Sequence, residues 1–452
     1  MNLDRLSFIR LFVLALLFVL LGSLAFSPEV PLVEAAPRAT RPPKATATAQ
    51  ANPTPTAPAN PTPTPLPTAT PGGGSGYPGS WSIVSSPNVN GRSNLLNAIT
   101  AVSTQDLWAV GEHRTANVSN VQTLTMHWNG ASWTIVPSPN PDPNRNRLAG
   151  VAALSASDVW AVGEQGGSTG PNWSSLILHW DGSTWSTVAA PTLSPGTSEL
   201  RDVAAVAAND VWAVGAASSP ATDWWDQPLV LHWNGISWSS VPVPSFGTTA
   251  ELNGITAVAP NDIWAVGTTL ESNWKTLILH WDGAAWTRIS SPNLGSFGNY
   301  LYDVEAISAT DVWAVGSANN GSSTLAMRWN GSSWSIVPSP NGTARAGINR
   351  NGLNSLAAVS ANNIWAVGVQ AYSTIGSAGQ PIYLGYALIE HWNGSAWQEV
   401  PAPALPGVGE DGELRGATAS GAGAVWAAGA YYDSSFSVQA HRTLIEQYTS
   451  NP

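Results

Sequence analysis

One short pattern recurs along most of this chain, an Asp or Asn, an apolar residue, Trp, Ala, Val and Gly. Its tryptophans are Trp108, Trp160, Trp212, Trp264, Trp313, Trp365 and, in the variant "AVWAAG", Trp426. Successive tryptophans are 52, 52, 52, 49, 52 and 61 residues apart. A period near 50 residues that is held over seven units is typical of propeller blades or of a solenoid.

Each unit divides into four short apolar segments, which we name a to d. In the unit at 252–293 they read "GITAV", "IWAVG", "LILHW" and "WTRIS". The Asp or Asn between a and b can close a tight turn, and the "DG" or "NG" between c and d is a strong hairpin signal. No stretch of the units shows helical periodicity. The pattern therefore predicts an all-β protein, a seven-bladed β-propeller of four-stranded antiparallel blades.

The seventh unit, at 413–452, contains segments a, b and c but no segment d. A lone segment of type d, "SWSIV" at 80–84, stands before the first repeat. If this N-terminal strand completes the C-terminal blade, the ring closes and no sheet edge is left exposed. We therefore predict N-terminal strand closure.

Tryptophan marks three of the four segments. Of 24 tryptophans, seven lie in segment b, six in c and seven in d, and Tyr448 takes the place in the last c. A buried tryptophan removes about 150–250 Å² from water, and stacked blades need apolar side chains on both faces. We expect these twenty tryptophans in the core.

The repeat "DVWAVG…LILHWDGSTWSTV" resembles those of bacterial secreted propeller proteins over 79–452. It is similar to tectonin-type repeats, and more distantly to kelch and Asp-box propellers. It lacks the Gly-Gly doublet of kelch, and the spacing from Asp181 to Trp185 is one residue short for an Asp-box. No catalytic set carries over from either. The tectonin-like resemblance implies surface recognition, often of glycans or proteins.

The first 78 residues differ from the repeats. Arg5 and Arg10 precede an apolar run at 11–26, and small residues follow at 33–37. This arrangement predicts a secretory signal peptide over 1–36, with an uncleaved membrane anchor as the alternative. Alternating Pro and Thr over 37–78 predict an extended stalk. We expect a secreted or surface-tethered protein with the propeller at 79–452.

Composition narrows the partners. Residues 79–452 hold 12 Lys and Arg against 25 Asp and Glu, a balance that argues against nucleic acid and against anionic membrane surfaces. Contact with a membrane is expected only through an uncleaved N-terminal segment. The chain has no cysteine, and five of its seven histidines share one place in segment c with Arg328 and Gln447. That place is a repeated packing slot rather than a zinc site, so we expect no cofactor or metal, and we expect a monomer.

Variable loops on a rigid scaffold are where binding residues gather. Here the loops between b and c, and between d and the next a, vary most. They carry aromatic candidates for stacking on a ligand: Trp173, Trp224, Trp225, Trp274, Tyr383, Tyr386, Tyr431 and Tyr432. The alternative is that Trp173, Trp224 and Trp274 cap the blade interfaces and are mostly buried.

Strand a should line the central channel, where five charged residues interrupt small or neutral ones. They are Arg201, Asp202, Asp303, Glu305 and Arg415. Such a mixed-charge cluster could bind a polar ligand or an ion, and the alternative is a set of solvated rim charges.

These observations favour a non-catalytic extracellular recognition module that binds glycan or protein through the variable loops. Two alternatives remain open at this stage. One is a structural surface protein without a specific ligand, and the other is a polysaccharide hydrolase or lyase. An enzyme needs carboxylates or other catalytic groups that converge in one pocket, and the spacing identifies no such set.

Overall fold

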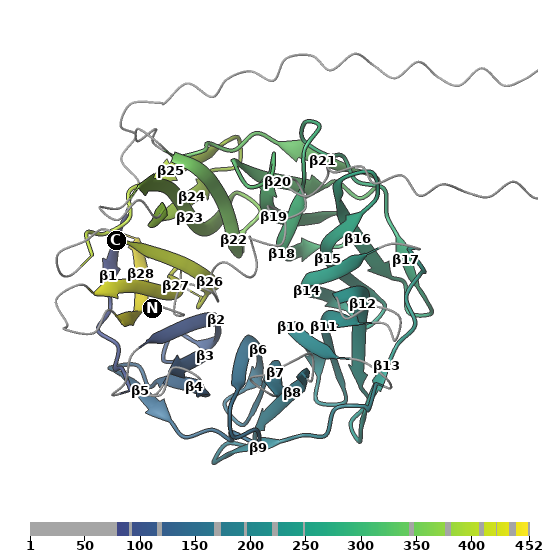
Figure 1. Ribbon diagram of the computed structural model, residues 1–452, viewed down its shortest axis with the longest axis vertical. Coiled ribbons are helices and arrows are strands. Elements are labelled where there is room, and N and C mark those ends of the chain that lie inside the picture. The colour runs from purple at the N-terminus through teal and green to yellow at the C-terminus, as the bar shows by residue number, and fades with distance from the viewer. Residues whose placement is uncertain are drawn as a thin grey trace, which may run out of the picture. The chain divides into compact units, whose positions relative to one another are not determined.

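The computed structural model describes residues 79–89, 93–114, 120–166, 173–193, 197–218, 225–246, 249–342, 348–375, 381–405, 411–421, 423–433 and 440–450. Within these ranges 28 strands form seven four-stranded antiparallel sheets around a ring, which confirms the predicted fold (Figure 1). No helix in the same ranges is long and apolar enough to cross a membrane. The predicted signal peptide and stalk lie outside the described residues.

Strand a, the innermost of each blade, is β2 (Asn94–Ser103), β6 (Asn146–Ser155), β10 (Ser198–Ala207), β14 (Ala250–Ala259), β18 (Tyr300–Ser308), β22 (Ile348–Ser360) or β26 (Gly412–Ala419). Strand b is β3 (Asp106–Arg114), β7 (Asp158–Gly166), β11 (Asp210–Ser218), β15 (Asp262–Leu270), β19 (Asp311–Ala318), β23 (Asn363–Ile375) or β27 (Val425–Asp433). Strand c is β4 (Val121–Trp128), β8 (Trp173–Trp180), β12 (Trp225–Trp233), β16 (Trp274–Trp281), β20 (Ser323–Trp329), β24 (Pro381–Trp392) or β28 (Ala440–Ser450). Strand d is β5 (Trp133–Val136), β9 (Trp185–Thr187), β13 (Trp238–Ser240), β17 (Trp286–Arg288), β21 (Trp334–Val337), β25 (Trp397–Val400) or β1 (Gly79–Ile83).

The inner strands are longer than the apolar segments predict, and strand d is shorter. In blade 4, β14 pairs with β15 from Ala250, four residues before the predicted start. The register shifts between Leu252 and Gly254, a β-bulge next to the channel. A side chain at Gly254 would meet the Cα of Asp303 in the next blade at 2.9 Å, so glycine permits this close approach.

Strand β1 completes blade 7 as predicted. It pairs antiparallel with β28, from Gly79 opposite Ser450 to Ile83 opposite Glu446. The following residues continue the attachment, because the Thr443 amide donates to Asn88 Oδ1 at 3.0 Å. Asn140, Asn293 and Asn341 make the same contact to the strand-c threonine of blades 1, 4 and 5. The N-terminal segment thus supplies the missing strand d of blade 7 and also the asparagine that binds the strand-c threonine of that blade.

The core lies between neighbouring blades, and the tryptophan prediction needs one correction. Tryptophans of strands b and d are at most 8% exposed and meet across the interfaces, as Trp81 and Trp365 do, with ring centroids 5.4 Å apart. The strand-c tryptophans are not all core. Trp392 is buried, but five are half-buried because they lie near the turns that end the blades: Trp128, Trp180, Trp233, Trp281 and Trp329.

The strand-c histidine slot is structural, as predicted, and the structure shows its partner. His127 Nε2 lies 2.8 Å from Asp106 Oδ1 at the start of strand b, and its ring packs on Trp108. Blades 2, 3 and 4 repeat this arrangement. In blade 5 the guanidinium of Arg328 binds Asp311 and packs over Trp313. In blades 1 to 5 the Asp of the a–b turn therefore does more than close the turn, since it also binds the His or Arg of strand c.

Candidate functional site at the channel mouth

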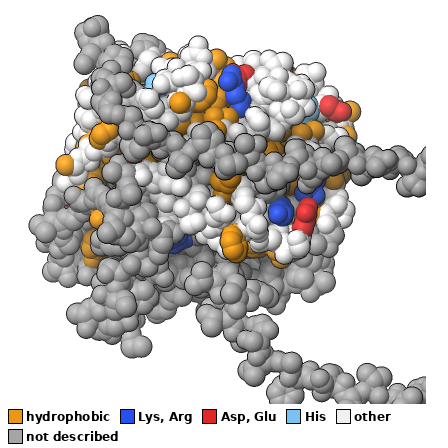
Figure 2. Space-filling model, turned by 90° about the horizontal axis from the view of Figure 1, so that it is seen from above, with side chains coloured by type: hydrophobic (Ala, Val, Ile, Leu, Met, Phe, Trp, Pro, Cys, Tyr) orange, Lys and Arg blue, Asp and Glu red, His pale blue; other side chains and the backbone are white. Residues whose placement is uncertain are grey.

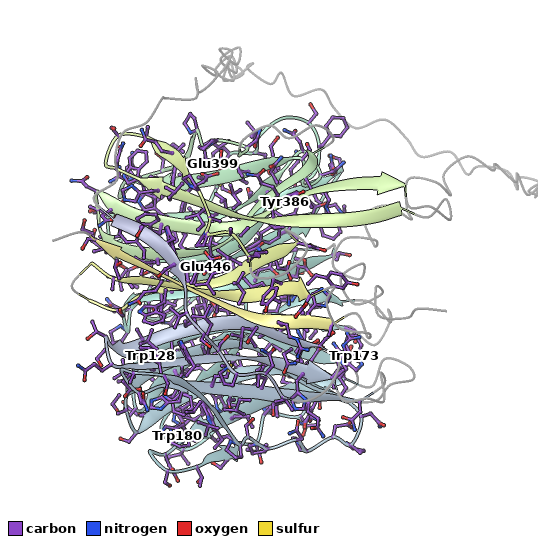
Figure 3. The ribbon with its side chains drawn as sticks, turned by 90° about the vertical axis from the view of Figure 1, so that its left-hand side faces the viewer. Trp128, Trp173, Trp180, Tyr386, Glu399 and Glu446 are labelled. Atoms are coloured by element: carbon purple, nitrogen blue, oxygen red, sulfur yellow. The ribbon has the colours of Figure 1, made fainter. Side chains whose placement is uncertain are left out.

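The two faces of the ring differ in their loops. Strand a begins at the face of the b–c and d–a loops, which we call the loop face, and ends at the face of the a–b and c–d turns, the turn face. In the view of Figure 3, Trp173 lies at one side of the propeller and Trp128 and Trp180 lie toward the other. The starts of the seven strands a therefore surround the channel mouth on the loop face.

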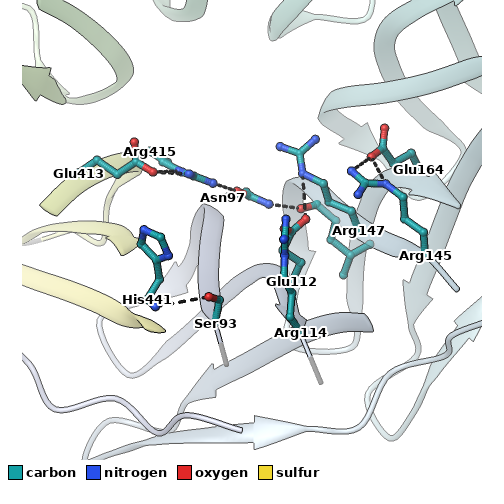
Figure 4. A network of polar contacts seen from close by, with 11 residues as sticks. Ser93, Asn97, Glu112, Arg114, Arg145, Arg147, Glu164, Glu413, Arg415 and His441 are labelled. Atoms are coloured by element: carbon teal, nitrogen blue, oxygen red, sulfur yellow. Dashed lines mark hydrogen bonds and ion pairs between the residues drawn. The ribbon is translucent and has the colours of Figure 1, made fainter. Parts of the chain in front are cut away.

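Charged residues tie neighbouring blades together around this mouth. Arg415 of blade 7 binds Glu413 of its own strand and donates from Nη1 to Asn97 Oδ1 of blade 1 at 2.7 Å (Figure 4). Asn97 in turn donates from Nδ2 to the carbonyl of Leu148 in blade 2 at 2.7 Å. Three blades are thereby linked through two side chains.

The links continue through blades 1 and 2. Arg147 Nε lies 3.3 Å from Glu112 Oε2, and Arg145 donates from Nε to Glu164 Oε1 at 2.9 Å (Figure 4). The side chain of Glu164 is only 3% exposed. Burial raises the pKa of Glu164, Arg145 lowers it, and nearby Glu199 raises it again, with a net upward shift.

Arg201 takes the same position in blade 3 as Arg415 in blade 7. It donates to Glu199 at 2.7 Å, to Glu251 of blade 4 at 2.9 Å and to Asn253 of blade 4. Burial lowers the pKa of Arg201, but Glu251 and Glu199 outweigh it and the net shift is upward. We call Glu112, Arg145, Arg147, Glu164, Glu199, Arg201, Glu251, Glu413 and Arg415 the mouth belt.

The other three predicted channel residues are separate from this belt. Asp202 Oδ2 accepts from the Ile255 amide at 2.9 Å, and Asp303 Oδ2 accepts from the Leu356 amide at 2.8 Å, each across a blade interface. Burial and the charge of Asp303 raise the pKa of Asp202 to about 8. Burial and the charges of Asp303 and Asp202 raise the pKa of Glu305 to about 8. Among the described residues no group of three acidic, His or Cys side chains could hold a metal ion.

The predicted aromatic candidates are partly covered. Trp173 is half-buried, with the Arg145 guanidinium 5.3 Å from its ring centroid, and Trp274 is half-buried, 6.0 Å from the ring of Tyr300. Tyr386, Tyr431 and Tyr432 are also half-buried. Trp224 lies outside the described residues. Trp225 and Tyr383 belong to β12 and β24, but their side chains are not among those described. A ligand-binding role for this set stays a prediction.

Seven belt residues were absent from the sequence-based candidates: Glu112, Arg145, Arg147, Glu164, Glu199, Glu251 and Glu413. Four of these seven residues share one position of the repeat, which is visible in the sequence. Arg147, Glu199, Glu251 and Glu413 all precede the strand-a leucine, at the place where Tyr300 stands in blade 5. The partners of this position lie on other strands or in the next blade, so its pairing could not be predicted from spacing.

Replacing Arg201 with Ala should lower the free energy of unfolding by about 3 kcal/mol, because Glu199 and Glu251 would stay largely buried without their cation. Arg288→Ala is the matched control, since its pair with Glu271 is 41% and 48% exposed and should contribute under about 1 kcal/mol. Denaturant unfolding of both variants measures the difference. Equal losses would contradict a structural role for the belt.

No family model matches the chain, and no curated protein matches it. Solved structures of the same fold do. YCF48 bound to D1 peptide has a TM-score of 0.50 at 13% identity, covering 82% of this chain and 96% of that one. YCF48 from Cyanidioschyzon merolae has a TM-score of 0.47 at 14% identity, covering 81% and 98%. A puromycin hydrolase complexed with PGG has a TM-score of 0.50 at 11% identity, covering 78% and 52%. At these identities the likeness shows the fold alone.

Proposed function

We propose that this protein is a non-catalytic extracellular binding module that holds a protein partner at the channel mouth of its loop face. One observation carries this proposal. Six of the ten basic residues that the structure describes lie at or beside the start of strand a or the end of strand b, around the mouth: Arg114, Arg145, Arg147, Arg201, Arg350 and Arg415. Arginine, tryptophan and tyrosine are the side chains enriched at the centres of protein interfaces.

The belt supports binding because it is both ordered and accessible. Contacts to carboxylates or amides fix Arg145, Arg147, Arg201 and Arg415, and yet their side chains are 17–25% exposed. A partner that contacts preordered side chains loses less conformational entropy on binding than one that must order them. On the side of the ring shown in Figure 2, basic groups lie beside acidic ones.

A protein partner fits the aromatic residues better than a glycan does. Stacking on sugar rings needs an open aromatic face, whereas Trp173 faces Arg145 and Trp274 packs near Tyr300. The fold itself can present a peptide-binding surface, since YCF48 has been solved with a bound peptide. Gly79 pairs with Ser450 at the turn face, so a stalk before Gly79 would leave the mouth facing away from the tether.

Peptides selected from a displayed random library against the full chain should bind the loop face. Trp173→Ala combined with Trp274→Ala should weaken their binding at least about tenfold, as expected for aromatic residues at an interface centre. The matched control is Ile236→Ser, which changes a side chain 85% exposed on the turn face. Titration calorimetry compares the three proteins. If the double variant binds as tightly as the wild type, or if only glycans bind this face, the proposal is wrong.

A further inference from the structure

A polar groove lies on the outer part of blade 4, apart from the mouth belt. It has a volume of about 370 Å³, and its lining includes Glu271, Lys275, Thr276, Arg288, Ser290 and Ser291. Lys275 and Thr276 come from β16, Arg288 from β17, and the two serines from the loop after β17. Pockets of about 300–1,000 Å³ are the usual size for small-molecule ligands.

Lys275 is exceptional in two respects. It is the only lysine between residues 79 and 452. All nine other basic side chains in the described ranges have at least one ion pair, hydrogen bond or other electrostatic contact, whereas the ammonium group of Lys275 has neither an ion pair nor a hydrogen bond within those ranges. The half-buried Lys275 therefore adds an uncompensated positive charge to the groove of an otherwise acidic propeller.

Arg288 is fixed in the same groove. Its Nη2 donates to Glu271 Oε1 at 2.8 Å, and its guanidinium carbon lies 5.7 Å from the centroid of the Phe246 ring in the loop after blade 3. The groove thus brings together two cations, one carboxylate, several hydroxyl groups and a neighbouring aromatic ring. The formal charges of Lys275, Arg288 and Glu271 sum to one positive charge, which matches a ligand with a single carboxylate.

Comparison among the blades separates this set from the scaffold. The tie between a strand-c threonine, a serine and an asparagine is made in blades 1, 4, 5 and 7, so Thr276, Ser291 and Asn293 serve the fold. At the places of Lys275 and Arg288, blade 5 has Ser323 and Ile336, and blade 1 has Gln122 and Ile135. Only blade 4 has two cations there, and neither is needed to build a blade.

We propose that this groove binds one sugar-acid unit of an acidic polysaccharide. Lys275 and Arg288 would bind the carboxylate, because both cations can donate charge-assisted hydrogen bonds to it. Glu271 and Ser290 would accept hydrogen bonds from ring hydroxyls. Glu271 also disfavours a dianion such as phosphate at this place. The site is independent of the partner proposed for the channel mouth.

A titration of the full chain with trigalacturonate tests the proposal, with a neutral glucose trisaccharide and acetate as comparison ligands. Saturable binding of trigalacturonate alone is the expected result. K275S combined with R288I gives blade 4 the residues of blade 5, and it should weaken binding at least tenfold. The melting temperature of this variant should stay near that of the wild type, which would exclude loss of folding as the cause.

Four outcomes would overturn the proposal. The first is that trigalacturonate fails to saturate the protein at millimolar concentration, and the second is that it binds the double variant as tightly as the wild type. Equal binding of the neutral trisaccharide would remove the role of the two cations. Acetate that competes as strongly as the trisaccharide acid would reduce the groove to a carboxylate site without sugar recognition.

Discussion

Replacing Trp81 with Ala should lower the free energy of unfolding by about 4 kcal/mol, the range found when a buried tryptophan is truncated. Trp81 is 8% exposed and packs against Trp365 and Tyr448, at centroid distances of 5.4 and 5.9 Å. It is the main apolar contact of β1, the strand that closes the ring. Thermal and denaturant unfolding of the purified variant provide the measurement.

The neighbouring Ser80 is the matched control for Trp81. Its side chain is exposed on the same strand, so Ser80→Ala should change stability by less than about 0.5 kcal/mol. Deleting residues 79–88 should be more damaging still, because it removes the strand and the Asn88 tie to Thr443 and exposes the edge of β28. A deletion variant that unfolds like the wild type would show that closure contributes nothing to stability.

Replacing Glu446 with Leu should raise stability at pH 8 by about 3 kcal/mol and flatten its dependence on pH. Glu446 is fully buried in β28, and among the described residues neither of its carboxyl oxygens has a hydrogen-bond partner. Burial raises the pKa of Glu446 to about 8, above its ordinary value of 4.5. The unfolded chain therefore releases this proton first, and the wild type should lose stability as the pH rises from about 4.5 to 8.

The other blades show which residues the place of Glu446 normally holds, and Glu446→Gln is the control variant. At the same place in strand c, blades 1 to 5 have the apolar residues Met126, Leu178, Leu231, Leu279 and Met327. Glu446→Gln should also remove the pH dependence of this group, but without the gain in stability, since an unpartnered polar group stays buried. The free energies of unfolding at pH 5 and pH 8 distinguish the wild type, Glu446→Leu and Glu446→Gln. If wild type and Glu446→Leu show the same change between the two pH values, Glu446 is not the responsible group.

The fold could be predicted because it depends on features that are local in sequence. Tryptophan spacing defined the blades, and the lone "SWSIV" matched the strand that the last blade lacks. The lengths of the strands could be predicted less well. β23 and β24 of blade 6 extend to Ile375 and from Pro381, because pairing continues well past the apolar core residues that the pattern detects.

The candidate site was less predictable because its contacts join residues that are distant in the chain. Arg201 and Arg415 were recognised as unusual channel residues, but Arg415 meets Asn97 across 318 positions and across the point of ring closure. No pattern within one repeat encodes such a pair. The five channel candidates accordingly looked like one cluster, whereas Arg201 and Arg415 belong to the mouth belt and Asp202 and Asp303 accept hydrogen bonds from backbone amides of the next blade.

The most direct test of binding at the loop face uses the absence of cysteine from this chain. Phe297→Cys and Ile236→Cys each introduce one thiol at an exposed apolar position, on the loop face and on the turn face respectively. Each variant is labelled with a bulky maleimide polymer, and its affinity for the library-selected peptides is measured. We expect the label at position 297 to abolish binding and the label at position 236 to leave it unchanged. Blockage from position 236 but not from position 297 would place the binding site on the turn face and contradict the proposal.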